Sequence, residues 1–71
     1  MWLKRSIIEK ILVANGLTRK QLAKELECGE SHLNAVIDGK AEADESLSRL
    51  LIAAFGAEVM VRAIDWRRSA A

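Results

Sequence analysis

Few side chains in this sequence could do covalent or metal chemistry. The chain has one histidine, His32, and one cysteine, Cys28. No third group is spaced to orient them as a nucleophile and a base, and Cys28 belongs to no CxxC pair that would indicate a zinc site. We therefore expect no enzyme, no metal and no cofactor. Cys28 is expected to be a small core residue and His32 a half-exposed helix residue.

Side chains that could bind rather than react gather in residues 30–35, ESHLNA. A carboxylate, a hydroxyl, an imidazole and an amide follow one another closely there. Before them come Thr18, Arg19 and Lys20, where exposed helix amides and cationic side chains would both favour an anion. Lys40 follows them. This arrangement favours a binding function if the backbone presents these residues on one surface.

Two short helices joined by a three-residue turn are predicted for residues 16–40. The first helix, residues 19–26, begins at a capping box in which Thr18 and Gln21 bond reciprocally. Glu27, Cys28 and Gly29 form the turn, and the second helix, residues 30–38, ends at Gly39. Five apolar residues at helical spacing predict a shared buried seam: Leu22, Leu26, Leu33, Val36 and Ile37.

Three further helices complete a compact all-α fold of five helices. The first covers residues 3–15 and stops at Gly16. The fourth is capped by Asp44 or Ser46 and ends at Gly56. The fifth covers residues 57–68. The apolar stripe of the first helix is Leu3, Ile7, Ile8, Ile11 and Leu12, and that of the fourth is Leu47, Leu50, Leu51, Ala54 and Phe55.

The length and composition indicate one domain, residues 1–71. The 71 residues are 51% hydrophobic and include no proline, so the chain is neither disordered nor rich in turns and strands. The net charge is only +1, but basic residues crowd the first third and acidic residues the middle. The longest apolar run is far shorter than the ~20 residues of a membrane span, and no signal peptide is apparent. A lone cysteine fits a reducing, cytoplasmic location.

With these helices, the chain resembles the lambda-repressor-like (Xre/Cro/CI) DNA-binding domains of phage and bacterial regulators. The resemblance covers residues 7–55 and is strongest over residues 17–39. The matching positions are Leu22, Ala23, Cys28, Leu33, Val36, Gly39 and Lys40. Two features depart from the pattern. Glu27 stands where the family usually has a turn glycine, and the second helix of the motif has no lysine or arginine but carries Glu30 and Asp38.

The resemblance implies a helix-turn-helix whose second helix enters the DNA major groove. It assigns base contacts to Glu30, Ser31, His32, Asn34 and Ala35. Glu30 can accept from a cytosine amino group and Asn34 can bond adenine, while Ser31 can serve either base. Glu30 could instead only complement the helix dipole. Phosphate contacts are expected from Thr18, Arg19, Lys20 and Lys40.

Residues 57–71 are a candidate dimerisation segment, because the helix predicted there has apolar residues on more than one face. Met60 and Ile64 form one stripe, and Val59, Ala63 and Trp66 form another. One stripe can cover the core, and the other would be exposed in a monomer. The predicted interface contains Val59, Met60, Ala63, Ile64 and Trp66. Alternatively, Trp66 folds back onto the core, and Trp2 is expected to cover the core as well.

The sequence therefore predicts a sequence-specific DNA-binding transcriptional regulator of the phage or bacterial repressor type. It would bind double-stranded DNA at a near-palindromic operator as a homodimer. One alternative is an antitoxin-type autoregulator, which would also bind a second small protein. Another is a protein-interaction module that has kept the fold and lost DNA binding, as the acidic second helix would suggest. No membrane partner is expected.

Overall fold

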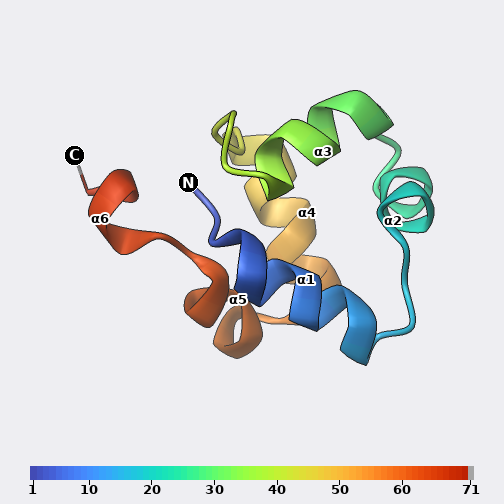
Figure 1. Cartoon of the computed structure of the whole chain (residues 1–71), viewed down its shortest axis with the longest axis horizontal. Helices are drawn as coiled ribbons and strands as arrows, with labels where there is room; N and C mark the ends of the chain where they lie inside the picture. Colours follow the sequence, from blue (N-terminus) through green and yellow to red (C-terminus); the bar gives the residue numbers. More distant parts are fainter. Residues whose placement is uncertain (71) are drawn as a thin grey trace.

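The computed structural model describes residues 1–70, and over these residues the chain is all-helical, with six helices and no strand (Figure 1). Ala71, the last residue of the predicted domain and of the candidate dimerisation segment, lies outside the described residues. The helices are α1 (Arg5–Ala14), α2 (Arg19–Glu25), α3 (Glu30–Ile37), α4 (Glu45–Phe55), α5 (Ala57–Ala63) and α6 (Trp66–Ser69). None of them is long and apolar enough to cross a membrane.

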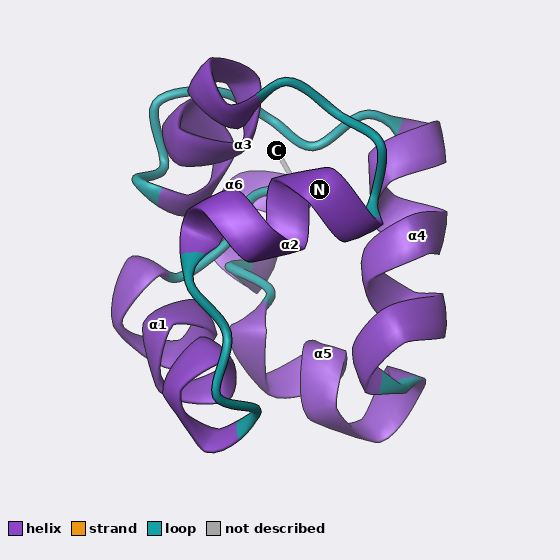
Figure 2. Ribbon diagram, turned by 90° about the vertical axis from the view of Figure 1, so that its right-hand side faces the viewer, coloured by secondary structure: helices purple, strands orange, loops and turns teal. Residues whose placement is uncertain are grey.

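The helices enclose one apolar core. α2 packs on α3, α4 on α5, and α1 on both α3 and α5, so that α1 contacts one helix of each pair. In Figure 2, α1 and α4 lie on opposite sides of the molecule. α1 to α5 each contribute buried apolar residues, such as Ile8, Ile11 and Leu12 from α1, whereas α6 contributes none. The largest fully buried side chains are Ile8, Leu22, Leu33, Val36, Ile37, Leu51 and Met60.

Most predicted helix ends are confirmed. The capping box of Thr18 and Gln21 begins α2, and the carboxylate of Asp44, rather than Ser46, accepts from the Leu47 amide to begin α4. Gly16, Gly39 and Gly56 all have positive φ at the ends of α1, α3 and α4.

Three details of the prediction are wrong. The sequence predicts a first helix that begins at residue 3, but α1 begins at Arg5, and Leu3 lies in an extended segment that pairs with Ile64. The stripe of α4 is narrower than expected, because Leu50 is 42% exposed and Ala54 is exposed as well. The predicted fifth helix is two helices, since the chain is extended at Ile64 and Asp65. An antiparallel bridge between Leu3 and Ile64 lies at this break, where the Lys4 amide donates to the Ala63 carbonyl and the Asp65 amide to the Trp2 carbonyl. Pairing with the segment before α1 therefore replaces the helical hydrogen bonds there.

The turn between α2 and α3 depends on one residue in the left-handed region. Glu27 has φ +54°, and the amide of Cys28 donates to the Ala23 carbonyl while that of Glu27 donates to the Lys24 carbonyl. This is the Schellman pattern of helix ends. The same pattern ends α1 and α3, but there the left-handed residue is Gly16 or Gly39. The turn thus has the conformation of a glycine turn without the glycine.

We predict that Glu27→Gly raises the free energy of unfolding by up to about 1 kcal/mol, because a residue with a Cβ is strained at this φ. The measurement is urea unfolding followed by circular dichroism. Glu25→Gly removes the same charge at a helical position and should destabilise the protein by roughly 0.5–1 kcal/mol. Equal destabilisation by both substitutions would contradict this account of the turn.

Candidate nucleic-acid interface

The candidate interface is built on the packing of α2 against α3. Leu22 and Ala23 of α2 are buried, and so are Leu33, Val36 and Ile37 of α3, the last three with no exposed surface. Ala23 is 4% exposed, and its small side chain lets the two helices approach closely. Cys28 is half-buried against the same core, as expected. The seam fixes which side of α3 faces outward.

The outward side of α3 carries three of the five predicted base-contacting residues. Glu30, Ser31 and His32 are all exposed, in the first turn of the helix, whose start is Gly29. In residues 1–70, no group of three or more His, Cys, Asp or Glu side chains is arranged to hold a metal ion. The first turn therefore presents a carboxylate, a hydroxyl and an imidazole to solvent.

The other two predicted base contacts are less accessible. Asn34 and Ala35 are both half-buried. The Asn34 Oδ1 atom accepts a hydrogen bond from Arg19 Nη1 at 3.3 Å, which leaves the two amide N–H groups of Asn34 as donors. The carbonyl of Ala35 accepts from the amides of Lys40 and Ala41 at the end of α3. Ala35 can thus offer only a methyl group to a partner.

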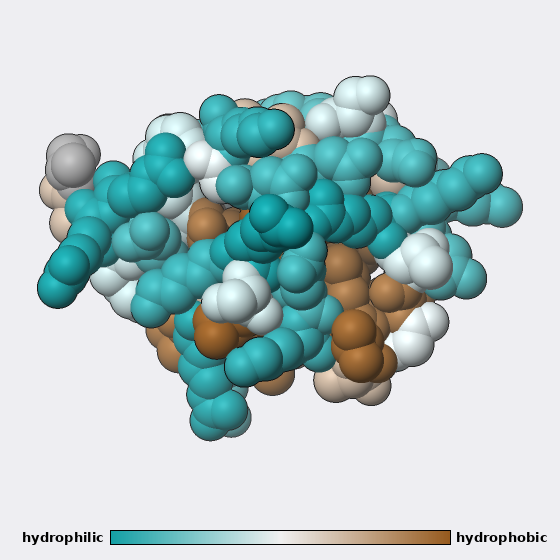
Figure 3. Space-filling view, viewed as in Figure 1, coloured by the Kyte–Doolittle hydropathy of each residue, from teal (hydrophilic) through white to brown (hydrophobic). Residues whose placement is uncertain are grey.

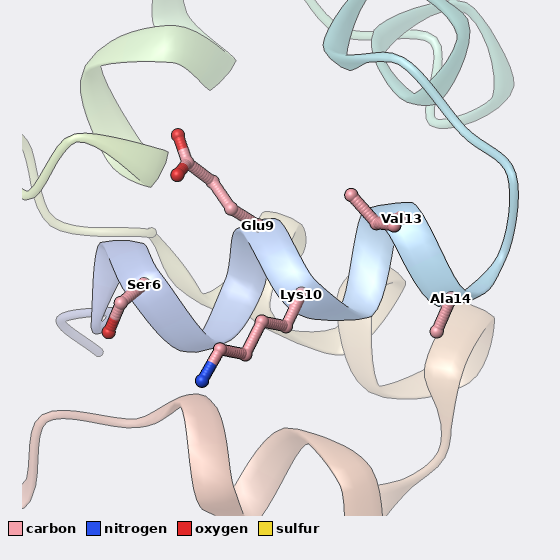
Figure 4. A pocket seen from close by; sticks show the side chains of 5 residues that line it. All are labelled: Ser6, Glu9, Lys10, Val13 and Ala14. Atoms are coloured by element: carbon pink, nitrogen blue, oxygen red, sulfur yellow. The ribbon is translucent and has the colours of Figure 1, made fainter.

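The ion-pair partners of Arg19 lie far from it in the sequence, on α1 and at the end of α3. Its Nη2 atom lies 2.6 Å from Glu9 Oε1 of α1 and 2.9 Å from Asp38 Oδ1 at the end of α3. Arg5 joins the same two carboxylates at 3.3 Å and 3.6 Å. We call Arg5, Glu9, Arg19 and Asp38 the Arg19 cluster. Figure 4 shows Glu9 pointing from α1 towards α3, whereas Lys10 points the other way, towards α5.

The Arg19 cluster bears on one predicted phosphate contact. The Arg19 side chain is only 26% exposed, and two carboxylates and an amide oxygen accept from three of the five N–H donors of its guanidinium group. Its hydrogen bond to Asp38 raises the pKa of Arg19 despite the opposing effect of burial. A cation held in this way links α1, α2 and α3 and has only part of its guanidinium group left for a phosphate group.

The remaining predicted phosphate contacts are accessible. Thr18, Lys20 and Lys40 are exposed, and within residues 1–70 neither lysine forms an ion pair. The Thr18 hydroxyl accepts from the Gln21 amide in the capping box, so its own O–H remains available as a donor. These groups lie at the beginning of α2 and just after α3.

The predicted dimer interface is divided between the core and two separate surfaces. Met60, Ala63 and Ile64 belong to the core, with 0%, 0% and 9% exposure, so they cannot contact a second chain in this conformation. Val59 is exposed and lines an open groove between α1 and α5, together with Ile7, Lys10, Ile11, Ala14 and Arg62. Trp66 lies on α6, after the two extended residues that separate α5 from α6.

The two tryptophans have different surroundings. Trp66 is 56% exposed and donates from Nε1 to the Val61 carbonyl, so it does not fold back onto the core. Trp2 is half-buried, and the guanidinium group of Arg68 lies over its ring, 3.7 Å from the centroid. Trp2 is therefore covered by α6 from outside.

Comparison of the chain with protein-family models, with curated proteins and with solved structures found no match. The interface is therefore interpreted from its own geometry and chemistry.

The Arg19 cluster makes a prediction about pH. Hydrogen bonds from Arg19 lower the pKa of both Glu9 and Asp38 below their ordinary values. Carboxylates with lowered pKa values stabilise the folded state above their unfolded pKa, and this stability is lost as the pH falls through the folded pKa. Arg19→Gln should therefore destabilise the protein near neutral pH, and the difference from the wild type should shrink as the pH falls from about 5 to about 3.

Thermal unfolding at several pH values is the measurement. Arg49→Gln is the matched control, because Arg49 forms one exposed pair with Glu45 on α4. Arg49→Gln should change the unfolding temperature only slightly at every pH. A difference between wild type and Arg19→Gln that stays constant down to about pH 3 would show that the cluster does not act through its carboxylates.

Proposed function

We propose that the chain is a sequence-specific DNA-binding transcriptional regulator of the lambda-repressor-like class. In this proposal α2, the turn at residues 26–29 and α3 act as a helix-turn-helix, and α3 enters the major groove. The observation that carries the proposal is the combination of a buried α2–α3 seam with an exposed polar first turn of α3. A recognition helix needs both, because the seam holds the helix rigidly while its free side reads the bases.

Glu30, Ser31 and His32 are the proposed base-reading residues. A glutamate can accept a hydrogen bond from the cytosine amino group, and a serine can bond to several base edges. Asn34 would donate from its amide group one helical turn further on. Thr18, Lys20 and Lys40 would hold the phosphate backbone on either side, and thereby set the register of α3 in the groove.

The acidic character of α3 is partly neutralised. Asp38, which directly follows α3, is paired with Arg19 and Arg5, so Glu30 in α3 is the carboxylate that a phosphate group would meet unpaired. A single carboxylate at a base edge contributes to specificity, because it rejects bases that present an acceptor at the same place. We therefore propose that Glu30 limits the choice of site more than it adds to affinity.

A second candidate function is a protein-interaction module, and the groove between α1 and α5 favours it. Its lining combines apolar side chains with the cations Lys10 and Arg62, and Val13 at the end of α1 is 80% exposed. In Figure 3, hydrophobic side chains reach the surface near α1 and α5, whereas the surface over α3 is more hydrophilic. An antitoxin-type regulator would use this groove for its partner and α3 for DNA.

The same groove is where we propose that a homodimer forms, with Val59 as its exposed apolar contact. A dimer would place two recognition helices on one face of the DNA, about 34 Å apart. Sedimentation at micromolar concentration should give the mass of a dimer. A monomer at that concentration would remove the dimer from the proposal but leave DNA binding by each chain in place.

The test of DNA binding is selection of bound sequences from a pool of random duplexes at low salt. We expect a short common sequence to be enriched, and Glu30→Gln to change the preferred base at one position of it. Glu58→Gln, which removes the same charge on α5, should select the unchanged sequence. The affinity should also fall steeply as salt rises, because several phosphate contacts are involved.

Failure of the wild-type chain to enrich any sequence at low salt would contradict the proposal. Binding to a protein partner that is insensitive to salt would then favour the interaction module, since apolar contacts do not release counterions.

A further inference from the structure

We propose that α6 and the segment before α1 form a second surface that contacts the phosphates of duplex DNA. We call it the α6 patch and define it by Lys4, Trp66, Arg67 and Arg68. The inference rests on the proposed function, which it extends by naming where the duplex continues beyond α3. It involves none of the residues that the sequence predicted to contact DNA.

Long-range hydrogen bonds bring the parts of the patch together. The bridge between Leu3 and Ile64 sets the first residues of the chain beside the break before α6. The Trp2 amide donates to Ser69 Oγ, which adds a contact to α6 itself. Lys4, Asp65, Trp66 and Arg67 line one small hollow on the surface. Two cations far apart in the sequence thus stand beside an exposed indole ring.

Arg68 connects the patch to the end of α3. Its Nη1 atom donates to the Gly39 carbonyl at 2.9 Å, and its guanidinium group stacks on Trp2. Gly39 is the residue directly before Lys40, the exposed lysine already proposed as a phosphate contact. The cationic surface therefore continues from Lys40 to α6.

The acidic residues near the patch are engaged in other contacts. Asp65 accepts from the Arg68 amide at the start of α6, and Glu42 pairs with the amino group of Met1. Asp38 belongs to the Arg19 cluster. Lys4 and Arg67 have no ion-pair partner in the described part of the chain. In the patch, Lys4, Arg67 and Arg68 outnumber Asp65, so this end of the molecule is locally positive although the chain as a whole has a net charge of +1.

The patch lies at the opposite end of the molecule from α2 (Figure 1). α2 and α6 thus lie on either side of α3 along the longest dimension of the molecule, which is 31 Å. One turn of duplex DNA measures about 34 Å. A chain that lies along the duplex can therefore contact DNA phosphates beyond both ends of α3.

Duplex phosphates fit this patch better than unpaired bases do. Surfaces that bind single strands stack successive bases on several aromatic rings. Here one ring, Trp66, is exposed, while Trp2 is already covered by Arg68. The Trp66 Nε1 atom is also used by the Val61 carbonyl. Cations spaced around a single fixed ring suit a sugar–phosphate backbone.

The test measures binding of a fluorescently labelled 20-base-pair duplex of random sequence, by anisotropy over a range of salt concentrations. Loss of two phosphate contacts lowers the slope of log affinity against log salt by about 1.8. We expect this change for the double variant Lys4→Ala and Arg67→Ala, with an affinity at least about 10-fold weaker at low salt. Lys24→Ala with Arg49→Ala is the control, since it removes the same charge from exposed positions on α2 and α4 and should keep the wild-type slope.

Tryptophan fluorescence gives an independent measurement. In Trp2→Phe, Trp66 is the remaining tryptophan, and duplex DNA at the patch should quench its emission. A wild-type slope in the double variant, or unchanged Trp66 emission when the duplex is bound, overturns the α6 patch while DNA binding through α3 stands. A wild-type chain that binds no duplex at low salt overturns both.

Discussion

The structure depends on the mutual burial of two helices that are too short to be stable alone. α2 has seven residues and α3 eight, whereas isolated helices shorter than about 12–15 residues are marginal in water. Their stability must come from the seam of Leu22, Leu33, Val36 and Ile37. The left-handed turn at Glu27 is the geometric condition for that seam, because it reverses the chain within a few residues. The outward direction of Glu30, Ser31 and His32 follows from the same packing.

The Arg19 cluster has two consequences for this arrangement. It ties α1 to the α2–α3 pair through charged hydrogen bonds at the edge of the core, and it neutralises the carboxylate at the end of α3. It also holds Arg19 against Glu9 and Asp38. In the proposed function, the cations that would contact DNA lie towards the two ends of α3, at Lys20 and at Lys40 with α6. Contact with phosphates on either side of the groove suits an α3 that has no lysine or arginine of its own.

The features fixed by local chemistry could be predicted from the sequence. The capping box of α2 and the glycine ends of α1, α3 and α4 follow from residues within about one helical turn of one another, and the apolar seam follows from the helical spacing of apolar residues within α2 and within α3. The placement of Arg19 could not be predicted, since its partners Glu9 and Asp38 are 10 and 19 residues away. Residues 57–68 have a continuous helical pattern, so the break at Ile64 was missed. Its cause is pairing with Leu3, although Asp65 as a helix cap was a local signal that could have been recognised. Leu50 was assigned to the core because the pattern shows spacing but not how wide a stripe the neighbouring helices cover.

The central claim is that the first turn of α3 faces DNA. Nuclear magnetic resonance of the ¹⁵N-labelled chain, titrated with the duplex selected by the wild-type protein, tests it most directly. The account predicts that the largest shifts of backbone amide signals fall on Glu30, Ser31 and His32 and on the start of α2, while amides of α4 change little. Largest shifts along α1 and α5, with the first turn of α3 unaffected, would contradict it.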